Sequence, residues 1–147
     1  MLTMRLFQPT DIPEVARIVE SSLGESYPPS LYLTVHNLWR EGFIVMHDGG
    51  RMVGFVAAVP SGEKVARVLM LAVEPGSRRK SYGRTLMQEL YSNCLAKGLD
   101  TVVLEVRKSN EAAISFYTRQ GFTIYGEISK FYSNGEDAYK MMKVLRS

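Results

Sequence analysis

A short apolar segment that runs into a basic, glycine-containing turn carries the strongest chemical signal in this sequence. Residues 71–84 read LAVEPGSRRKSYGR, and a helical pattern follows. The first N–H groups of a helix lack partners and lie at the positive end of its dipole, so they attract anions. Gly83 would let a ligand approach the backbone, and Ser81 offers a helix cap or a hydroxyl. Four basic side chains strengthen the field: Arg78, Arg79, Lys80 and Arg84. The turn predicts a site for a small polyanion, with a solvated basic helix start as the alternative.

Two residues further along could carry acid–base chemistry. Glu105 lies in the apolar run TVVLEVR, where a carboxylate is costly to bury unless it is paired, hydrated or in use. It is a candidate general base, although an alternating strand would also show Glu105 and Arg107 on one polar face. Tyr117 follows on a helix that begins at Asn110, so the two side chains could converge. Tyr117 is a candidate general acid, with core packing as the alternative.

Other catalytic arrangements find little support. His36 and His47 have no Cys or His nearby at metal-ligand spacing, so no metal site is expected. The dinucleotide pattern Gly-x-Gly-x-x-Gly and the P-loop pattern are both absent. Acyl carriers are therefore the better candidates for the anionic ligand.

Length and composition favour a single domain over residues 1–147. A chain of this length with 46% hydrophobic residues can bury a continuous core. The net charge of +3 suits an anionic ligand but falls short of the basic faces of nucleic-acid binders. The single cysteine, Cys94, is expected to be a buried thiol. With no apolar run of about 20 residues, we expect a cytoplasmic protein with no membrane or nucleic-acid partner.

Hydrophobic periodicity predicts alternating helices and strands. Asp11 and Glu14 form an expected capping box, Ser30 and Asn110 are expected helix caps, and Gly98 ends a helix. The predicted strands cover residues 4–7, 43–46, 52–59, 64–73, 101–107, 122–126 and 138–145.

The order of strand, helix and strand from residue 64 to residue 107 predicts a parallel strand pair. Ligands favour the carboxyl ends of such strands. The basic turn begins at one of these ends, so the predicted polyanion site and the parallel pair coincide.

Residues 73–87 and 104–122 resemble the two signature segments of the GNAT acetyltransferase superfamily, and the resemblance spans nearly the whole chain. It implies an α/β (α+β) fold: a mixed, mostly antiparallel central sheet with a splayed parallel strand pair and helices on both faces. Within the superfamily, three segments are most similar to protein N-terminal acetyltransferases of the ribosomal-protein-alanine type and of the N-terminal acetyltransferase A catalytic subunit type. These segments are residues 23–27, 107–110 and 130–139.

The resemblance implies acetyl-CoA as the donor and CoA as a product. The pyrophosphate would lie on residues 78–84, and Asn110 would contact the cofactor arm. Tyr117 would protonate the departing thiolate, and Glu105 would accept a proton from the amine, through water. The backbone contacts to the arm would come from Leu71, Ala72 and Val73.

The acceptor implied by the resemblance is the N-terminus of a protein or peptide. Leu23, Glu25 and Tyr27 would line the groove for its first residues together with Tyr132. The resemblance leaves open an auxiliary subunit or ribosome association. A small-molecule amine or lysine side chains are the alternative acceptors, and a CoA- or nucleotide-binding sensor without turnover is the alternative to an enzyme.

Two positions depart from the family pattern. Ser81 stands where the cradle of the family has its first glycine, and we expect it to present its N–H with a helical φ. Phe131 replaces the first of two paired tyrosines, which removes one hydroxyl and leaves Tyr132.

Overall fold

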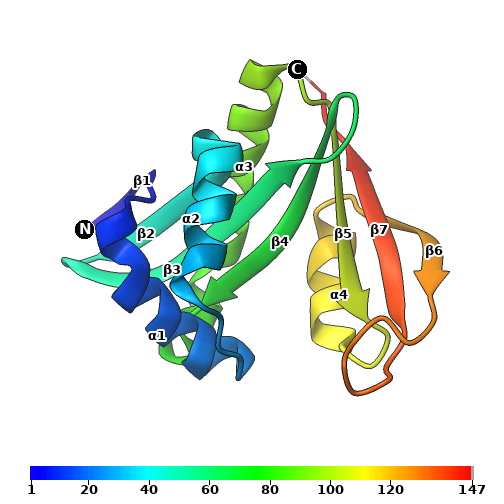
Figure 1. Cartoon of the computed structure of the whole chain (residues 1–147). Coiled ribbons are helices and arrows are strands. Elements are labelled where there is room, and N and C mark those ends of the chain that lie inside the picture. The colour runs from blue at the N-terminus through cyan, green and yellow to red at the C-terminus, as the bar shows by residue number, and fades with distance from the viewer. Residues whose placement is uncertain (147) are drawn as a thin grey trace.

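The computed structural model describes residues 1–146, and the side chains of residues 78–80 lie outside the described part. Seven strands form one sheet in the order β1-β2-β3-β4-β5-β7-β6 (Figure 1). The strands are β1 (Leu2–Leu6), β2 (Phe43–Asp48), β3 (Arg51–Pro60), β4 (Val65–Val73), β5 (Thr101–Arg107), β6 (Thr123–Ile128) and β7 (Ala138–Val144). The helices are α1 (Ile12–Leu23), α2 (Pro29–Leu38), α3 (Tyr82–Lys97) and α4 (Glu111–Arg119), with short 3₁₀ turns at Pro9–Asp11, Arg40–Gly42 and Pro75–Lys80.

The sheet is antiparallel except between β4 and β5. These two strands pair in parallel over three positions, from Val65↔Thr101 to Arg67↔Val103, and then part. Figure 1 shows them diverging toward their carboxyl ends. The predicted parallel pair and its splay are therefore confirmed, and the sheet contains an internal gap.

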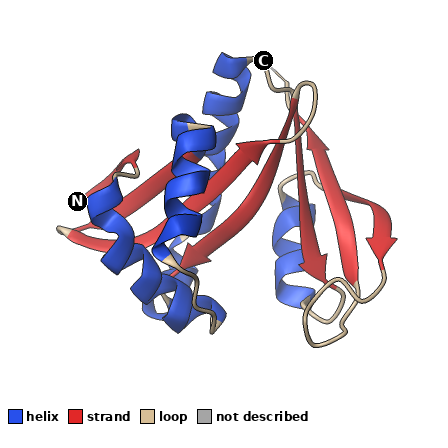
Figure 2. Cartoon of the chain, viewed as in Figure 1, coloured by secondary structure: helices blue, strands red, loops and turns tan. Residues whose placement is uncertain are grey.

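Helices cover both faces of the sheet (Figure 2). One apolar core lies under α1 and α2 and includes Phe7, Ile18 and Phe55. A second core lies under α3 and includes Leu86 and Leu90. β3 is buried along most of its length because it contributes to both cores, which explains its continuous apolar sequence.

Several predicted boundaries are confirmed. β5 has the predicted bounds, Thr101–Arg107. Gly49 and Gly50 form the hairpin turn between β2 and β3 with φ of 64° and 85°, a conformation that favours glycine. Gly98 ends α3 with a φ of 86°. Among the described residues, no helix has the length and apolar character needed to cross a membrane.

Two predicted helix caps are wrong. The side chain of Asp11 makes no cap bond to α1. Its carboxylate instead accepts hydrogen bonds from the guanidinium of Arg5, both at 2.8 Å, and from the N–H of Gln8. A charged partner on β1 is a stronger donor than the orphan N–H groups of the helix. Ser30 does not cap α2, because that helix already begins at Pro29, whose fixed φ suits the first helical position.

Candidate active site

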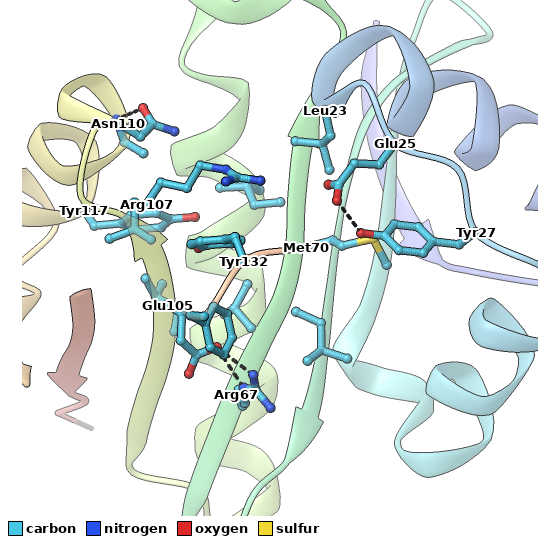
Figure 3. A pocket seen from close by; sticks show the side chains of 17 residues that line it. Leu23, Glu25, Tyr27, Arg67, Met70, Glu105, Arg107, Asn110, Tyr117 and Tyr132 are labelled. Carbon is cyan, nitrogen blue, oxygen red and sulfur yellow. Dashed lines mark hydrogen bonds and ion pairs between the residues drawn. The ribbon is translucent and has the colours of Figure 1, made fainter. Parts of the chain in front are cut away.

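The gap between β4 and β5 contains a cavity of about 440 Å³. β4 carries a bulge at Leu69, since Met70 pairs with Ala57 and Val68 pairs with Ala58 on β3. The bulge and the splay turn side chains of both strands into the cavity (Figure 3). Its lining comes from four parts of the chain: Leu23, Glu25 and Tyr27; Arg67, Val68, Leu69, Met70 and Leu71; Leu104, Glu105, Val106, Arg107, Asn110, Ala113 and Tyr117; and Phe131 and Tyr132.

The carboxylate of Glu105 lies at the point where the strands part. Its side chain is 13% exposed and lines the cavity. Oε1 accepts two hydrogen bonds from Arg67, from Nη2 at 2.7 Å and from Nε at 3.0 Å. A nearly buried carboxylate needs such a partner. As the alternating pattern predicts, Glu105 and Arg107 lie on one face of β5, and both line the cavity.

Tyr117 faces the same cavity from α4. Its ring packs edge-on against Phe116 and Phe122, with centroid distances of 5.1 and 5.3 Å. Burial raises the pKa of the Tyr117 phenol above its ordinary value, because the charged form is disfavoured away from water. The phenol therefore stays protonated at neutral pH.

Asn110 is the predicted cap of α4, and the structure confirms it. Its Oδ1 accepts a hydrogen bond from the N–H of Ala113 at 3.0 Å. No described residue bonds to the amide nitrogen of Asn110, and the side chain lines the cavity. The amide thus has donors left for a ligand.

Two loops form the mouth of the cavity. The hydroxyl of Tyr27 donates to Oε2 of Glu25 at 2.8 Å, and burial together with this carboxylate raises the pKa of Tyr27 to about 12. On the other side, the guanidinium of Arg107 stacks over the ring of Tyr132 at 3.9 Å. Figure 3 shows the two tyrosines on opposite sides of the cavity. The four predicted substrate-binding residues therefore lie together.

Arg107 also fixes the loop that carries Tyr132. Its Nη1 donates to Oε2 of Glu136 at 2.9 Å, and Glu136 accepts a further bond from Ser109. The loop is thereby tied to the end of β5.

The predicted phosphate cradle lies between β4 and α3. Leu71 lines the cavity, whereas Ala72 and Val73 are buried beside it. Along residues 68–72, the strand pairing described for β4 is with β3 alone, so its other edge faces the gap. Backbone groups at this edge suit the extended amide-bearing arm of acetyl-CoA.

The expected conformation of Ser81 is wrong. Its φ is 61°, in the left-handed region, and its side chain makes no cap bond to α3. A glycine would adopt this backbone conformation freely, whereas a serine adopts it under strain.

Gly83 lies against Phe116: an added Cβ would be 3.2 Å from its Cζ. This glycine therefore makes room for a ring of α4, in addition to its expected role toward a ligand.

Three predicted cradle residues, Arg78, Arg79 and Lys80, have side chains outside the described part of the chain. The backbone there forms the 3₁₀ turn Pro75–Lys80. Arg84 follows in the first turn of α3. Ser81, Gly83 and Arg84 are not among the residues that line the cavity.

Arg67, Leu69 and Met70 line the cavity but were not predicted as site residues. Arg67 is the one charged residue of the otherwise apolar strand β4, and this signal could have marked it. No local pattern marks the bulge at Leu69. Among the described residues, no group of His, Cys, Asp and Glu could hold a metal ion.

The chain belongs to the GNAT acetyltransferase family, whose sequence pattern matches residues 12–122. Members of this family use acetyl-CoA, so the predicted fold and donor are confirmed. The crystal structure of Ard1 from Thermoplasma volcanium superimposes with a TM-score of 0.95 at 37% identity, over 99% of each chain.

Two named N-acetyltransferases are also similar to this chain. The ribosomal-protein-S18-alanine N-acetyltransferase from Escherichia coli has a TM-score of 0.86 at 26% identity, over 100% of this chain and 96% of its own. N-alpha-acetyltransferase 30 from Schizosaccharomyces pombe is 28% identical over 144 residues, which cover 95% of this chain and 96% of that protein. The predicted resemblance to N-terminal acetyltransferases is confirmed.

Proposed function

We propose that this protein transfers the acetyl group of acetyl-CoA to the α-amino group of protein or peptide N-termini. The observation that carries the proposal is the single cavity that joins Glu105, Tyr117 and the two-sided mouth formed by Tyr27 and Tyr132. A mouth built from two loops suits an extended chain end. Residues 1–147 would act as one N-acetyltransferase domain, since both cores pack on one sheet.

The choice of acceptor follows from the cost of deprotonating an amine. An α-amino group titrates at about 7.7–8.0 and a lysine side chain at about 10.4, a difference of roughly 2.5 units or 3.4 kcal/mol. Chain N-termini are therefore the easier nucleophiles for a carboxylate base. Glu105 would accept the proton, through a water molecule, as the new N–C bond forms.

Tyr117 would act at the other end of the reaction. When bound, acetyl-CoA supplies the thioester carbonyl that the amine attacks. As the C–S bond breaks, the sulfur leaves as a thiolate and needs a proton. The raised pKa of Tyr117 keeps that proton available at neutral pH, and no covalent enzyme intermediate is required.

The residues around the gap would bind the donor. The backbone of Leu71, Ala72 and Val73 and the amide of Asn110 would contact the arm, and the start of α3 with its basic turn would hold the pyrophosphate. Leu23, Glu25, Tyr27 and Tyr132 would bind the first residues of the acceptor.

The test is acetylation of defined acceptors by the purified chain. A peptide library with free α-amino groups should be acetylated at the N-terminus, as mass spectrometry would show. The same peptides with blocked α-amino groups and a free lysine, and polyamines, should react far more slowly. Faster reaction of polyamines would favour the small-amine alternative, and CoA binding without acetylation of any acceptor would favour the sensor.

The same assay tests whether the chain needs an auxiliary subunit or the ribosome for activity. We propose that the chain alone suffices for short peptides, because its own loops form both sides of the mouth. If acetylation appears only after a cell extract or ribosomes are added, an auxiliary subunit or ribosome association is required.

A further inference from the structure

The geometry points to Arg67 as a positioning residue for Glu105: its guanidinium fixes one carboxylate oxygen so that the other faces the reacting amine or its water. This inference rests on the proposed role of Glu105 as the base. It assigns a function to a residue that neither the sequence pattern nor the family signature singled out.

The first reason is the place of the pair in the fold. Arg67 is the last residue of β4 that pairs with β5, opposite Val103. Glu105 lies two residues beyond, on the same face of β5 as Val103. Arg67 therefore reaches Glu105 across the point where the strands part, and Figure 3 shows both side chains at the floor of the cavity.

The second reason is the pattern of hydrogen bonds. Nε and Nη2 of Arg67 both donate to Oε1 of Glu105, at 3.0 and 2.7 Å. No described residue donates to Oε2. Two donors from one rigid planar group set the plane of the carboxylate, and Oε2 is left to accept a proton.

The third reason is burial. Glu105 is 13% exposed and Arg67 is 36% exposed, and both line the cavity. At 13% exposure the carboxylate has little contact with water, so it needs hydrogen-bond donors from the protein. Arg67 supplies two of them and holds the carboxylate in one orientation beside the cavity.

The experiment measures kcat and KM for a peptide and acetyl-CoA in four proteins: the parent, Arg67→Met, Glu105→Gln and the double variant. We expect Arg67→Met to lower kcat about tenfold with little change in the KM for acetyl-CoA. In the Glu105→Gln background the same change should have no further effect, because the group it positions is gone. Arg5→Met is the matched control, since Arg5 makes a similar double contact to Asp11 far from the cavity, and it should leave kcat unchanged.

A second measurement separates positioning from a structural role. Guanidinium ion at millimolar concentration should restore part of kcat in Arg67→Ala and none in Arg67→Ala with Glu105→Gln. Thermal unfolding checks that each variant is folded, and Arg67→Lys, with a single point of contact, should fall between parent and Arg67→Met.

The outcomes are distinct. Full activity of Glu105→Gln would overturn the proposed base and this inference with it. An impaired Glu105→Gln beside a fully active Arg67→Met would overturn the inference alone. Equal losses in both backgrounds would show that Arg67 acts independently of Glu105 and would also overturn it. If Arg67→Met and Arg67→Ala do not fold, parent-like kcat in Arg67→Lys would overturn it.

Discussion

Tyr117 packs edge-on against Phe122, with ring centroids 5.3 Å apart, while its hydroxyl faces the cavity (Figure 3). Among the described residues none forms a hydrogen bond with this hydroxyl, so packing positions the ring. Tyr117→Phe should keep the packing and lower kcat by about 10²-fold, the size expected for a lost general acid. Steady-state kinetics and calorimetric titration with acetyl-CoA would measure both effects, and affinity should be nearly unchanged.

Tyr91→Phe is the control for this change. The Tyr91 hydroxyl donates to Oε1 of Gln120 at 2.6 Å, outside the cavity lining. Its loss should cost about 1 kcal/mol of stability and leave kcat unchanged. An active Tyr117→Phe would remove that residue from the mechanism.

The raised pKa of Tyr117 predicts the alkaline side of the pH–rate profile. A general acid works only while protonated, so a pKa above the ordinary value of about 10 moves the loss of activity to higher pH. The rate should rise as the α-amino group deprotonates near pH 8 and should not fall before about pH 10. A decline centred below pH 10 in initial-rate measurements would contradict the assignment.

Glu105→Gln should slow the reaction mainly at low pH. There the acceptor is protonated and a base is needed, whereas at high pH more of the amine is already neutral. The ratio of parent to variant kcat should therefore shrink as pH rises from about 6 to 9. A constant ratio across that range would argue against general-base catalysis by Glu105, and Glu127→Gln, which alters an exposed ion pair with Lys108, should match the parent throughout.

Ser81→Gly should stabilise the protein. Ser81 has a φ of 61°, and a residue with a Cβ pays roughly 1–2 kcal/mol in that region, offset in part by the greater freedom of glycine in the unfolded chain. A net gain of about 0.5–1 kcal/mol should appear in urea unfolding. Gly24→Ala makes the opposite change at a φ of 65° with no neighbour within 4 Å, so it should destabilise the protein by a similar amount. A loss of stability in Ser81→Gly would show that the Ser81 backbone is not strained.

Substitutions of Asn110 should separate two roles. Asn110→Ala removes the cap of α4 and should lower the stability by about 1 kcal/mol. It should also weaken the binding of acetyl-CoA. Asn110→Asp keeps an oxygen for the N–H of Ala113 and should preserve stability, but it removes the amide donors. Thermal unfolding and cofactor titration of the two variants would show this split, and equal affinity of Asn110→Asp and the parent would exclude the amide contact.

Local sequence signals were enough for most of the fold. The strand Thr101–Arg107, the cap at Asn110 and the stop at Gly98 each depend on residues that are neighbours in the chain. The caps assigned to Asp11 and Ser30 failed because tertiary partners and an adjacent proline decided those positions. Local propensity yields to such contacts.

The site residues were predictable from the family resemblance, except where a contact depends on how β4 and β5 pair. Arg67 and Glu105 are 38 residues apart, so their contact exists only because β4 and β5 pair at three positions and no further. The conformation of Ser81 was also not predictable from local preference, because its backbone is left-handed although serine disfavours that region.

Because the cofactor would bind in the gap between β4 and β5, the stability of the fold should depend on the concentration of acetyl-CoA. After Arg67 and Val103 the two strands no longer pair with each other, so a ligand could bridge them. A ligand at 100 times its dissociation constant adds about 2.7 kcal/mol to the stability of the state that binds it. Bound acetyl-CoA would then stabilise the sheet by linking β4 and β5, in addition to donating the acetyl group. The melting temperature of this protein should accordingly rise with the concentration of acetyl-CoA.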